Sequence, residues 1–291
     1  MNRFRDKVKT WLSFVKFSHT VFALPFALIG FSLAVSQAGH HFSIKILLLI
    51  ILCMIFARNA AMGFNRFADR KYDSLNARTL SREIPSGKIE NRSAVIFVII
   101  NVVLFIIATY FINLLAFILS PVALIIILGY SLTKRITVLC HFILGLGLSL
   151  APIGAYISVT GEFSLLPIIY SFIVLSWVSG FDIIYALQDD EFDRTNRLYS
   201  IPSKTGKANA LKISIAVHFL TFLFVIVAGY IGTAGYLFWM GAALFSILLV
   251  YQHLIVKNND ISRVNLAFAT TNGIASIVFA AFVILDLFLN Q

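Results

Sequence analysis

The sequence predicts an all-α membrane protein, with nine transmembrane helices in a single domain that covers residues 1–291. Its composition indicates a membrane, because 59% of the residues are hydrophobic and 12% are charged, whereas a soluble domain holds about 45–50% apolar and about 25% charged residues. The apolar residues also form continuous runs long enough to cross a bilayer, which takes about 20 residues per helix. Continuous runs disfavour a closed barrel, whose strands alternate apolar and polar residues.

Nine runs have this length. Four basic residues precede the first run, as in a signal peptide, but its apolar stretch continues to about Gln37 without an A-x-A cleavage site, so we expect an uncleaved helix. The third and fourth runs are joined tightly at Ile112–Asn113. The predicted spans are 12–36, 43–65, 93–111, 114–132, 138–159, 164–187, 208–230, 234–256 and 264–288.

The basic residues set the orientation of these helices. The N-terminal tail holds four, and the segments after the second, fourth, sixth and eighth helices hold seven, two, five and two, which places 20 of the 23 on one side of the membrane. The loops between them, QAGHHF, IN, TGEF and IGTAG, hold none. The positive-inside rule assigns the basic side and the N-terminus to the cytoplasm. Topology therefore explains most of the net charge of +10, and nucleic-acid binding is not expected.

The carboxylates gather at the cytoplasmic ends of two helices. In FNRFADRKYD, residues 64–73, the spacing of Asn65, Asp69 and Asp73 places them on one helix face. In YALQDDEFD, residues 185–193, Asp189 and Asp193 are also four apart. Like charges at this spacing repel, so ordinary ion pairs with nearby arginines and a cation site are two alternative interpretations. Hard carboxylate oxygens suit Mg²⁺, which takes few protein ligands and completes its shell with phosphate oxygens.

Two further ionisable residues lie deeper in the membrane. Asp182 stands seven residues before Asp189, and Arg58 seven before Asn65, about two turns further in on the same faces. Charges at that depth are costly unless paired and are functional candidates. Arg58 and Asp182 could pair with each other, or Arg58 could bind a substrate carboxylate through both guanidinium nitrogens. An Ile-Pro-Ser triplet follows each acidic run, which suggests two pseudo-repeated four-helix halves with facing acidic runs.

Three motifs resemble those of the UbiA superfamily of membrane prenyltransferases. NRFADRKYD resembles the family's N-x-x-x-D-x-x-x-D motif, GFDIIYALQDDEFD its second aspartate motif, and YSLTKR its Y-x-x-x-K-R stretch after the fourth helix. Their order and spacing match, so the resemblance covers nearly the whole chain, although Phe192 stands where a further acidic residue is frequent. It implies a nine-helix bundle around a cavity that opens toward the cytoplasm and laterally to lipid.

The resemblance also implies Mg²⁺-dependent transfer of a polyprenyl chain from a polyprenyl diphosphate to a small, usually aromatic acceptor. Two helix faces supply the expected metal ligands, which are Asn65, Asp69, Asp73, Asp189 and Asp193. Asp69 and Asp189 are also candidate catalytic residues. Positive charge and hydrogen bonds are needed at the diphosphate, and the expected substrate-binding set is Arg58, Asn65, Arg70, Tyr130, Lys134 and Arg135. For Lys134 and Arg135, positive-inside topology is the alternative reading.

Arg58 indicates the acceptor. In the family, an arginine at this spacing is linked to the carboxylate of a hydroxybenzoate-type acceptor, so we expect 4-hydroxybenzoate or a dihydroxynaphthoate and a place in ubiquinone or menaquinone biosynthesis. Asp182 is expected to accept a phenol hydrogen bond or to take the ring proton. Haem or another acceptor is an alternative, and so is a cation-coupled secondary transporter. The expected location is a bacterial-type inner membrane, with the site toward the cytoplasm.

Other polar residues have weaker indications. Lys16 and His19, near the cytoplasmic end of the first helix, are explained by snorkelling or by a diphosphate contact. His141 is either a site-wall residue or a helix-start residue, and His40 and His41 fall in an outer loop. The two cysteines are expected to be unpaired thiols.

Overall fold

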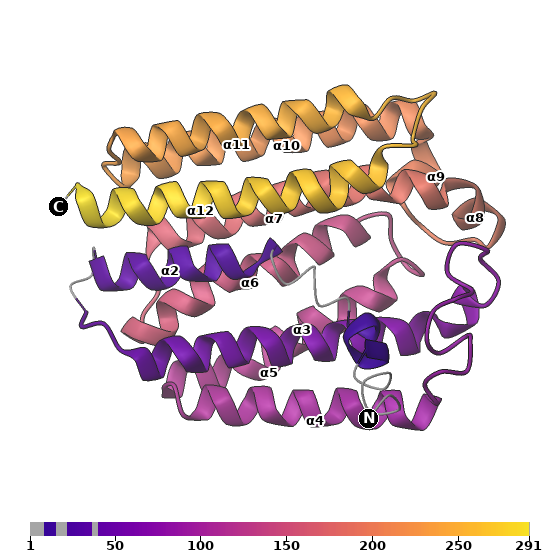
Figure 1. Ribbon diagram of the computed structural model, residues 1–291, viewed down its shortest axis with the longest axis horizontal. Helices are drawn as coiled ribbons and strands as arrows, with labels where there is room; N and C mark the ends of the chain where they lie inside the picture. Colours follow the sequence, from indigo (N-terminus) through magenta and orange to yellow (C-terminus); the bar gives the residue numbers. More distant parts are fainter. Residues whose placement is uncertain (1–8, 16–21, 37–39, 291) are drawn as a thin grey trace.

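The chain folds into a bundle of long helices (Figure 1). A computed structural model describes residues 9–15, 22–36 and 40–290, and these contain no β-strand. The helices in chain order are α2 (Leu24–Ser36), α3 (Ile44–Asp73), α4 (Asn91–Tyr110), α5 (Leu114–Thr133), α6 (Cys140–Thr160), α7 (Leu165–Ala186), the 3-10 turn η2 (Leu187–Asp189), α8 (Asp190–Thr195), α9 (Ile201–Thr205), α10 (Lys207–Ile231), α11 (Tyr236–Ile255), the π-helical turn η3 (Leu266–Thr271) and α12 (Asn272–Leu289). The all-α prediction is confirmed for the described residues.

Eight helical segments among the described residues are long and apolar enough to cross a membrane. They correspond to the second to ninth predicted spans. The first, 12–36, is described only in part: α2 has 13 residues, and Lys16 and His19 lie outside the described residues.

One helix extends well beyond its predicted limit, and the segment after another is not regular α-helix. α3 does not stop near residue 65 but continues to Asp73, so the whole first acidic run is helical. Arg70 and Lys71 occupy its last turn, where positive charge interacts favourably with the helix dipole. α7 ends at Ala186, and the chain then tightens into η2 before α8 begins. Asp189 is therefore presented by a 3-10 turn, and Asp193 by the short helix that follows.

Helix α7 forms the centre of the bundle and packs against α6, α10 and α2. Its Trp177 is fully buried, with ring contacts to Phe26 of α2 and Phe245 of α11 at centroid distances of 5.3 and 5.8 Å. The indole Nε1 donates to Oδ1 of Asn272 at 3.0 Å, which satisfies the polar group that a buried tryptophan carries. These contacts fix α7 and, with it, the acidic residues that follow it in η2 and α8.

The α4–α5 turn is held by one side chain. Asn113 caps α5 by accepting the N–H of Ala116 at 2.8 Å, and its Nδ2 donates to the Ile157 carbonyl of α6 at 2.8 Å. An Asn cap of this kind stabilises a helix start by about 1 kcal/mol. The tight join predicted at Ile112–Asn113 is thus a capped turn that also positions α5 beside α6.

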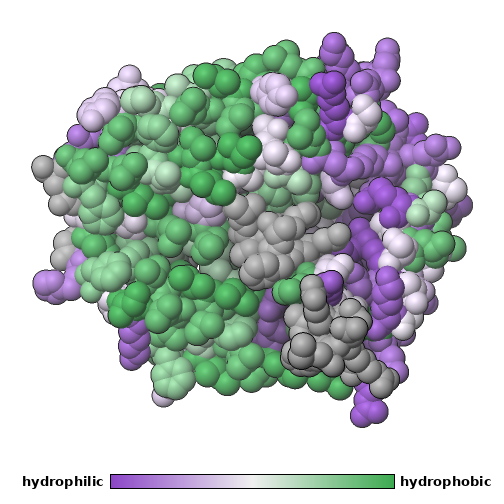
Figure 2. Space-filling model, in the orientation of Figure 1, coloured by the Kyte–Doolittle hydropathy of each residue, from purple (hydrophilic) through white to green (hydrophobic). Residues whose placement is uncertain are grey.

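The surface is apolar along the sides of the bundle and polar at one end (Figure 2). Hydrophilic side chains gather over the α3–α4 loop, α8 and α9, whereas large apolar residues such as Ile125 and Leu114 are about 72% exposed. Apolar exposure on this scale is stable only in lipid. The protein is an integral membrane protein, and both acidic runs lie at its polar end (Figure 1).

Candidate active site

A cavity of about 620 Å³ runs through the bundle between α3, α4, α5, α6 and α7. It reaches from the acidic runs at the polar end to Ile112 and Phe163, in the turns at the opposite end. It therefore follows the length of α5, whose 20 residues span about 30 Å. Ionic side chains line its polar end, and apolar ones its long inner part.

Ten of the eleven predicted site residues line this cavity: Arg58, Asn65, Asp69, Asp73, Tyr130, Lys134, Arg135, Asp182, Asp189 and Asp193. Arg70 does not. Its Nη1 donates to the Phe67 carbonyl at 2.7 Å and its guanidinium lies 4.2 Å from the Phe67 ring centroid. Arg70 is one position past Asp69 on α3, and a helix turns about 100° per residue, so its side chain leaves the cavity face. Its placement does not support the predicted substrate contact.

Basic side chains hold the carboxylates of the first acidic run. Oδ1 of Asp69 lies 3.0 Å from Nη2 of Arg135, and Oδ2 accepts from Asn65 Nδ2 at 3.0 Å. Oδ1 of Asp73 lies 2.7 Å from Nη1 of Arg82. Opposite charges thus offset the repulsion that the four-residue spacing creates.

The second acidic run is held in the same way. Asp189 receives two hydrogen bonds from Arg78, Nη2 to Oδ2 at 2.6 Å and Nε to Oδ1 at 3.1 Å, and a third from Asn76 Nδ2 at 3.1 Å. Oδ1 of Asp193, whose side chain is fully buried, lies 2.8 Å from Nζ of Lys134, while Oδ2 accepts from the Ser200 hydroxyl at 2.9 Å. Each acidic run therefore faces a set of cations.

The loop between α3 and α4 supplies site residues that the motifs did not indicate. Asn76, Arg78 and Arg82 line the cavity, and Arg78 joins this loop to the far acidic run. Arg66 of α3, only 3% exposed, lines it as well. The charge distribution predicted membrane topology or ordinary ion pairs for these arginines. Their concentration directly after the first acidic run was the signal that they could serve the site.

The carboxylates beside two of the cations raise the pKa of each cation. Burial lowers the pKa of the Lys134 ammonium, but the charge of Asp193 and the hydrogen bond to it outweigh this, so the pKa lies above its ordinary value. For Arg78, burial also lowers the pKa, and the charge and hydrogen bonds of Asp189 raise it further than burial lowers it. Both side chains are therefore available as cations for a phosphate group at neutral pH.

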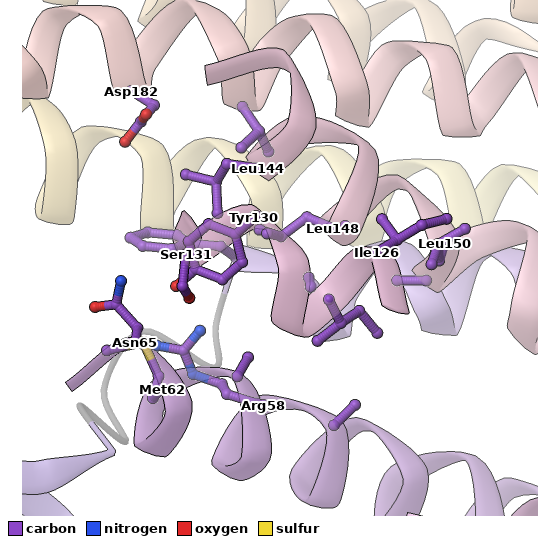
Figure 3. A pocket seen from close by; sticks show the side chains of 18 of the residues that line it. Arg58, Met62, Asn65, Ile126, Tyr130, Ser131, Leu144, Leu148, Leu150 and Asp182 are labelled. Carbon is purple, nitrogen blue, oxygen red and sulfur yellow. The ribbon is translucent and has the colours of Figure 1, made fainter. Parts of the chain in front are cut away.

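The deeper part of the cavity places Arg58 and Asp182 on different walls (Figure 3). Arg58 projects from α3 toward Tyr130 and Ser131 of α5, and Asp182 points into the cavity from α7. Asp182 contacts His141, whose Nδ1 lies 2.7 Å from its Oδ2. His141 lies in the first turn of α6 and also lines the cavity. It is therefore both a helix-start residue and a residue of the cavity wall.

The cysteines and the outer histidines take no part in these contacts. Cys53 and Cys140 are free thiols, as expected, and both line the cavity wall. His40 and His41 are exposed before α3.

The donor set fits Mg²⁺. It consists of oxygens from Asn65, Asp69, Asp73, Asp189 and Asp193 on the walls of one cavity, which are the ligands this hard cation takes. Oδ2 of Asp73 is buried and has no hydrogen-bond partner among the described residues. Within those residues, no three His, Cys, Asp or Glu side chains are already arranged around a common point. Asp69, Asp73, Asp189 and Asp193 instead form ion pairs with the basic side chains described above.

A membrane bundle whose charged cavity continues into an apolar tunnel has the form that an amphiphilic, anionic ligand fits. The model of the UbiA prenyltransferase family matches residues 23–284. The chain belongs to this family and is a prenyltransferase, which confirms the resemblance and disfavours the transporter alternative.

Curated relatives are similar over most of the chain. The 4-hydroxybenzoate octaprenyltransferase of Aliivibrio fischeri (strain MJ11) is 27% identical over 238 residues, which cover 81% of this chain and 82% of the relative. The enzyme of the same name from Francisella tularensis subsp. novicida (strain U112) is 26% identical over 252 residues, with 86% and 88% covered.

Solved structures share the fold. The apo structure of a UbiA homolog from Aeropyrum pernix K1 has a TM-score of 0.83 at 30% identity and covers 92% of this chain and 98% of its own. A UbiA homolog from Archaeoglobus fulgidus bound to DMAPP and Mg²⁺ has a TM-score of 0.70 at 22% identity, with 96% and 99% covered. At 22% identity, the similarity to the Archaeoglobus fulgidus protein shows the fold alone.

Proposed function

We propose that the protein transfers a polyprenyl chain from a polyprenyl diphosphate to an aromatic carboxylate, 4-hydroxybenzoate or a dihydroxynaphthoate, in ubiquinone or menaquinone biosynthesis. One observation carries the proposal: a single cavity joins ion-paired carboxylates at the polar end, an arginine halfway along α3, and an apolar tunnel as long as α5. These three parts match a diphosphate, an aromatic carboxylate and a polyprenyl tail. The relatives' names support the same acceptor class.

The reaction forms a bond between C1 of the prenyl chain and a ring carbon of the acceptor. The bond from C1 to the diphosphate oxygen breaks, and the diphosphate leaves with the electron pair. Lys134 and Arg78 offset its charge. Arg58 binds the acceptor carboxylate, and Asp182 takes the proton that the ring carbon loses. The apolar walls exclude water, which would otherwise capture the allylic cation.

Asn65, Asp69, Asp73, Asp189 and Asp193 would hold Mg²⁺. When bound, Mg²⁺ would supply Lewis-acid neutralisation of the diphosphate. The cations now paired with these carboxylates would then be free to contact phosphate oxygens. This exchange of partners explains why carboxylates and cations alternate around one end of the cavity.

For the topology, we propose nine transmembrane helices in one domain, with the N-terminus and the acidic runs on the cytoplasmic side of a bacterial inner membrane. The concentration of basic residues on the side of the acidic runs supports this orientation. The acidic run at the end of α3 and the one that follows α7 support two related halves. Cysteine-accessibility labelling in intact cells and in inverted vesicles tests the orientation of each loop.

Removing Mg²⁺ is expected to stop the reaction. We expect EDTA to lower the rate of prenyl transfer by about 10²-fold or more, because the diphosphate charge then loses its Lewis acid. The measurement is transfer of a radiolabelled prenyl group to 4-hydroxybenzoate by the purified protein. Circular dichroism before and after chelation checks that the helices persist. Full turnover in EDTA, or recovery with Na⁺ in place of Mg²⁺, would contradict the proposed cofactor.

A bulky residue at Gly154 is expected to select against long prenyl chains. Gly154 lines the cavity on α6, and a Cβ there would meet no atom within 4 Å. Gly154→Phe should fold, and its ring should fill part of the tunnel. We expect kcat/KM for octaprenyl diphosphate to fall roughly tenfold relative to that for geranyl diphosphate, because overpacking of the long tail against the ring costs about 1–3 kcal/mol. Gly129→Phe is the matched control, because Gly129 has equal space but lies outside the cavity lining. An unchanged ratio in Gly154→Phe would place the tail elsewhere.

A further inference from the structure

His141 contacts Asp182, and both nitrogens of its ring have partners within the protein. Its side chain is 2% exposed, and both ring nitrogens have protein partners: Nδ1 lies 2.7 Å from Oδ2 of Asp182, and Nε2 lies 3.2 Å from the backbone nitrogen of Ile201. Asp182 is more open, with 21% of its side chain exposed to the cavity that it lines. His141 has no ring nitrogen left for a substrate and can act on one only through Asp182.

The contact with Ile201 decides which nitrogen of His141 carries the proton. A backbone N–H can only donate, so Nε2 accepts from Ile201. The proton of the neutral ring is then on Nδ1, where it is donated to Asp182. A second proton on Nε2 would place two donors opposite each other, so the contact with Ile201 disfavours the doubly protonated ring.

Helix packing fixes the distance between the two side chains. Gly145 lies one turn after His141 on α6, and a Cβ there would be 2.5 Å from the Leu175 carbonyl oxygen and from Ser179 Oγ of α7. The absence of a side chain thus allows the two helices to approach. Ser179 Oγ donates to the Leu175 carbonyl oxygen at 2.6 Å and lies 3.3 Å from the backbone carbonyl oxygen of His141, which places the first turn of α6 against α7 one turn before Asp182.

We propose that His141 is a positioning residue for prenyl transfer. As the neutral Nδ1–H tautomer, it holds the Asp182 carboxylate ionised and turned into the cavity, where Asp182 takes the proton of the acceptor ring. A donor on a carboxylate favours the charged form, which is the form that can accept a proton. His141 keeps its own proton throughout. This inference rests on the proposed function, because it assigns a role to Asp182 in that reaction.

The kinetic test compares two variants at this position. In His141→Gln the amide can still donate to Asp182 and accept from Ile201, whereas His141→Leu can do neither. We expect His141→Leu to lower kcat by about 10²-fold, with the KM for prenyl diphosphate within about twofold, and His141→Gln to recover most of kcat. Wild-type kcat in His141→Leu would overturn the proposal, and so would equal losses in both variants.

A double variant separates a role through Asp182 from a general structural role. In an Asp182→Asn background, His141→Leu should change kcat less than about twofold further, because both act as one unit. A full additional loss in that background would overturn the proposal. If the wild type transfers no prenyl group, the proposed function fails. If Asp182→Asn is fully active, the proposed function stands but its proton-transfer step at Asp182 fails.

A spectroscopic test does not depend on the folding of the leucine variant. In protein labelled with ¹⁵N-histidine, the His141 signals are assigned by their loss in His141→Gln. We expect a protonated Nδ1 and an unprotonated Nε2 that stay so between about pH 6 and pH 8. A protonated Nε2, or a doubly protonated ring, would overturn the tautomer and the proposal with it.

Discussion

Replacing Asp189 by asparagine is expected to lower kcat about 10³-fold, the largest loss we predict. The substitution keeps the shape of the side chain but removes the charge that would hold Mg²⁺ and that orients Arg78 through two hydrogen bonds at 2.6 and 3.1 Å. Loss of about 4 kcal/mol of charge stabilisation in the transition state corresponds to this factor. The measurement is kcat for prenyl transfer at saturating Mg²⁺, together with the Mg²⁺ concentration that gives half-maximal binding of the prenyl diphosphate.

The neighbouring residue supplies a control for Asp189→Asn. Asp190 is as acidic and similarly buried, but it pairs with Arg194 one turn later at 3.0 Å and does not line the cavity. Asp190→Asn should leave kcat within about threefold of wild type and change stability by about 0–1 kcal/mol, as expected for a pair with an exposed partner. Equal losses in the two variants would mean that general acidity at this turn matters, and not the carboxylate that faces the cavity.

Replacing Arg58 by alanine is expected to raise the KM for the aromatic acceptor about 10²-fold, while the KM for prenyl diphosphate changes little. Arg58 faces the cavity beside Tyr130 and Ser131 (Figure 3), about two helical turns before the acidic run of α3. Hydrogen bonds to a carboxylate contribute about 1.5–3 kcal/mol, and about 3 kcal/mol is 10²-fold in affinity. Initial rates over a range of acceptor concentrations measure this effect.

Arg70→Ala is the matched control, because it removes the same charge from the same helix at a side chain that packs on Phe67 outside the cavity. It should leave both KM values within about twofold. A second readout is the acceptor itself: Arg58→Ala should lose its preference for 4-hydroxybenzoate over phenol, since phenol lacks the carboxylate. A preserved preference would assign the carboxylate to another cation of the cavity, such as Arg66.

The local pattern of the sequence was sufficient for the helices and for most of the site. Eight apolar runs became helices close to their predicted limits because continuous apolar surface is stable only as a helix in lipid. Asn65, Asp69 and Asp73 share a face because helical periodicity requires it. Periodicity also places Arg70 off that face, which the motif alone did not indicate, and its contacts with Phe67 agree with the periodicity.

Contacts between distant segments could not be predicted in this way. Arg78 is 111 residues from Asp189, and His141 is 41 residues from Asp182. Nothing in the periodicity of either segment specifies these pairs, because they depend on how α3, α6 and α7 pack. The 3-10 turn that presents Asp189 is likewise a feature of the folded chain, since the predicted helix had continued to residue 187 and the four-residue spacing suggested further helix beyond it.

By itself, the sequence determined that the chain is a helical membrane protein with two acidic runs at one end, and its motifs identified the family. Those properties follow from composition, charge distribution and spacing along single helices, which act locally. Only the tertiary structure decided that the acidic runs rest on arginines of the α3–α4 loop and on Lys134, that a tunnel follows α5, and that Asp182 is held by His141. These are pairings across helices, and they arise from close approaches such as that of α6 to α7 at Gly145, which local sequence does not encode.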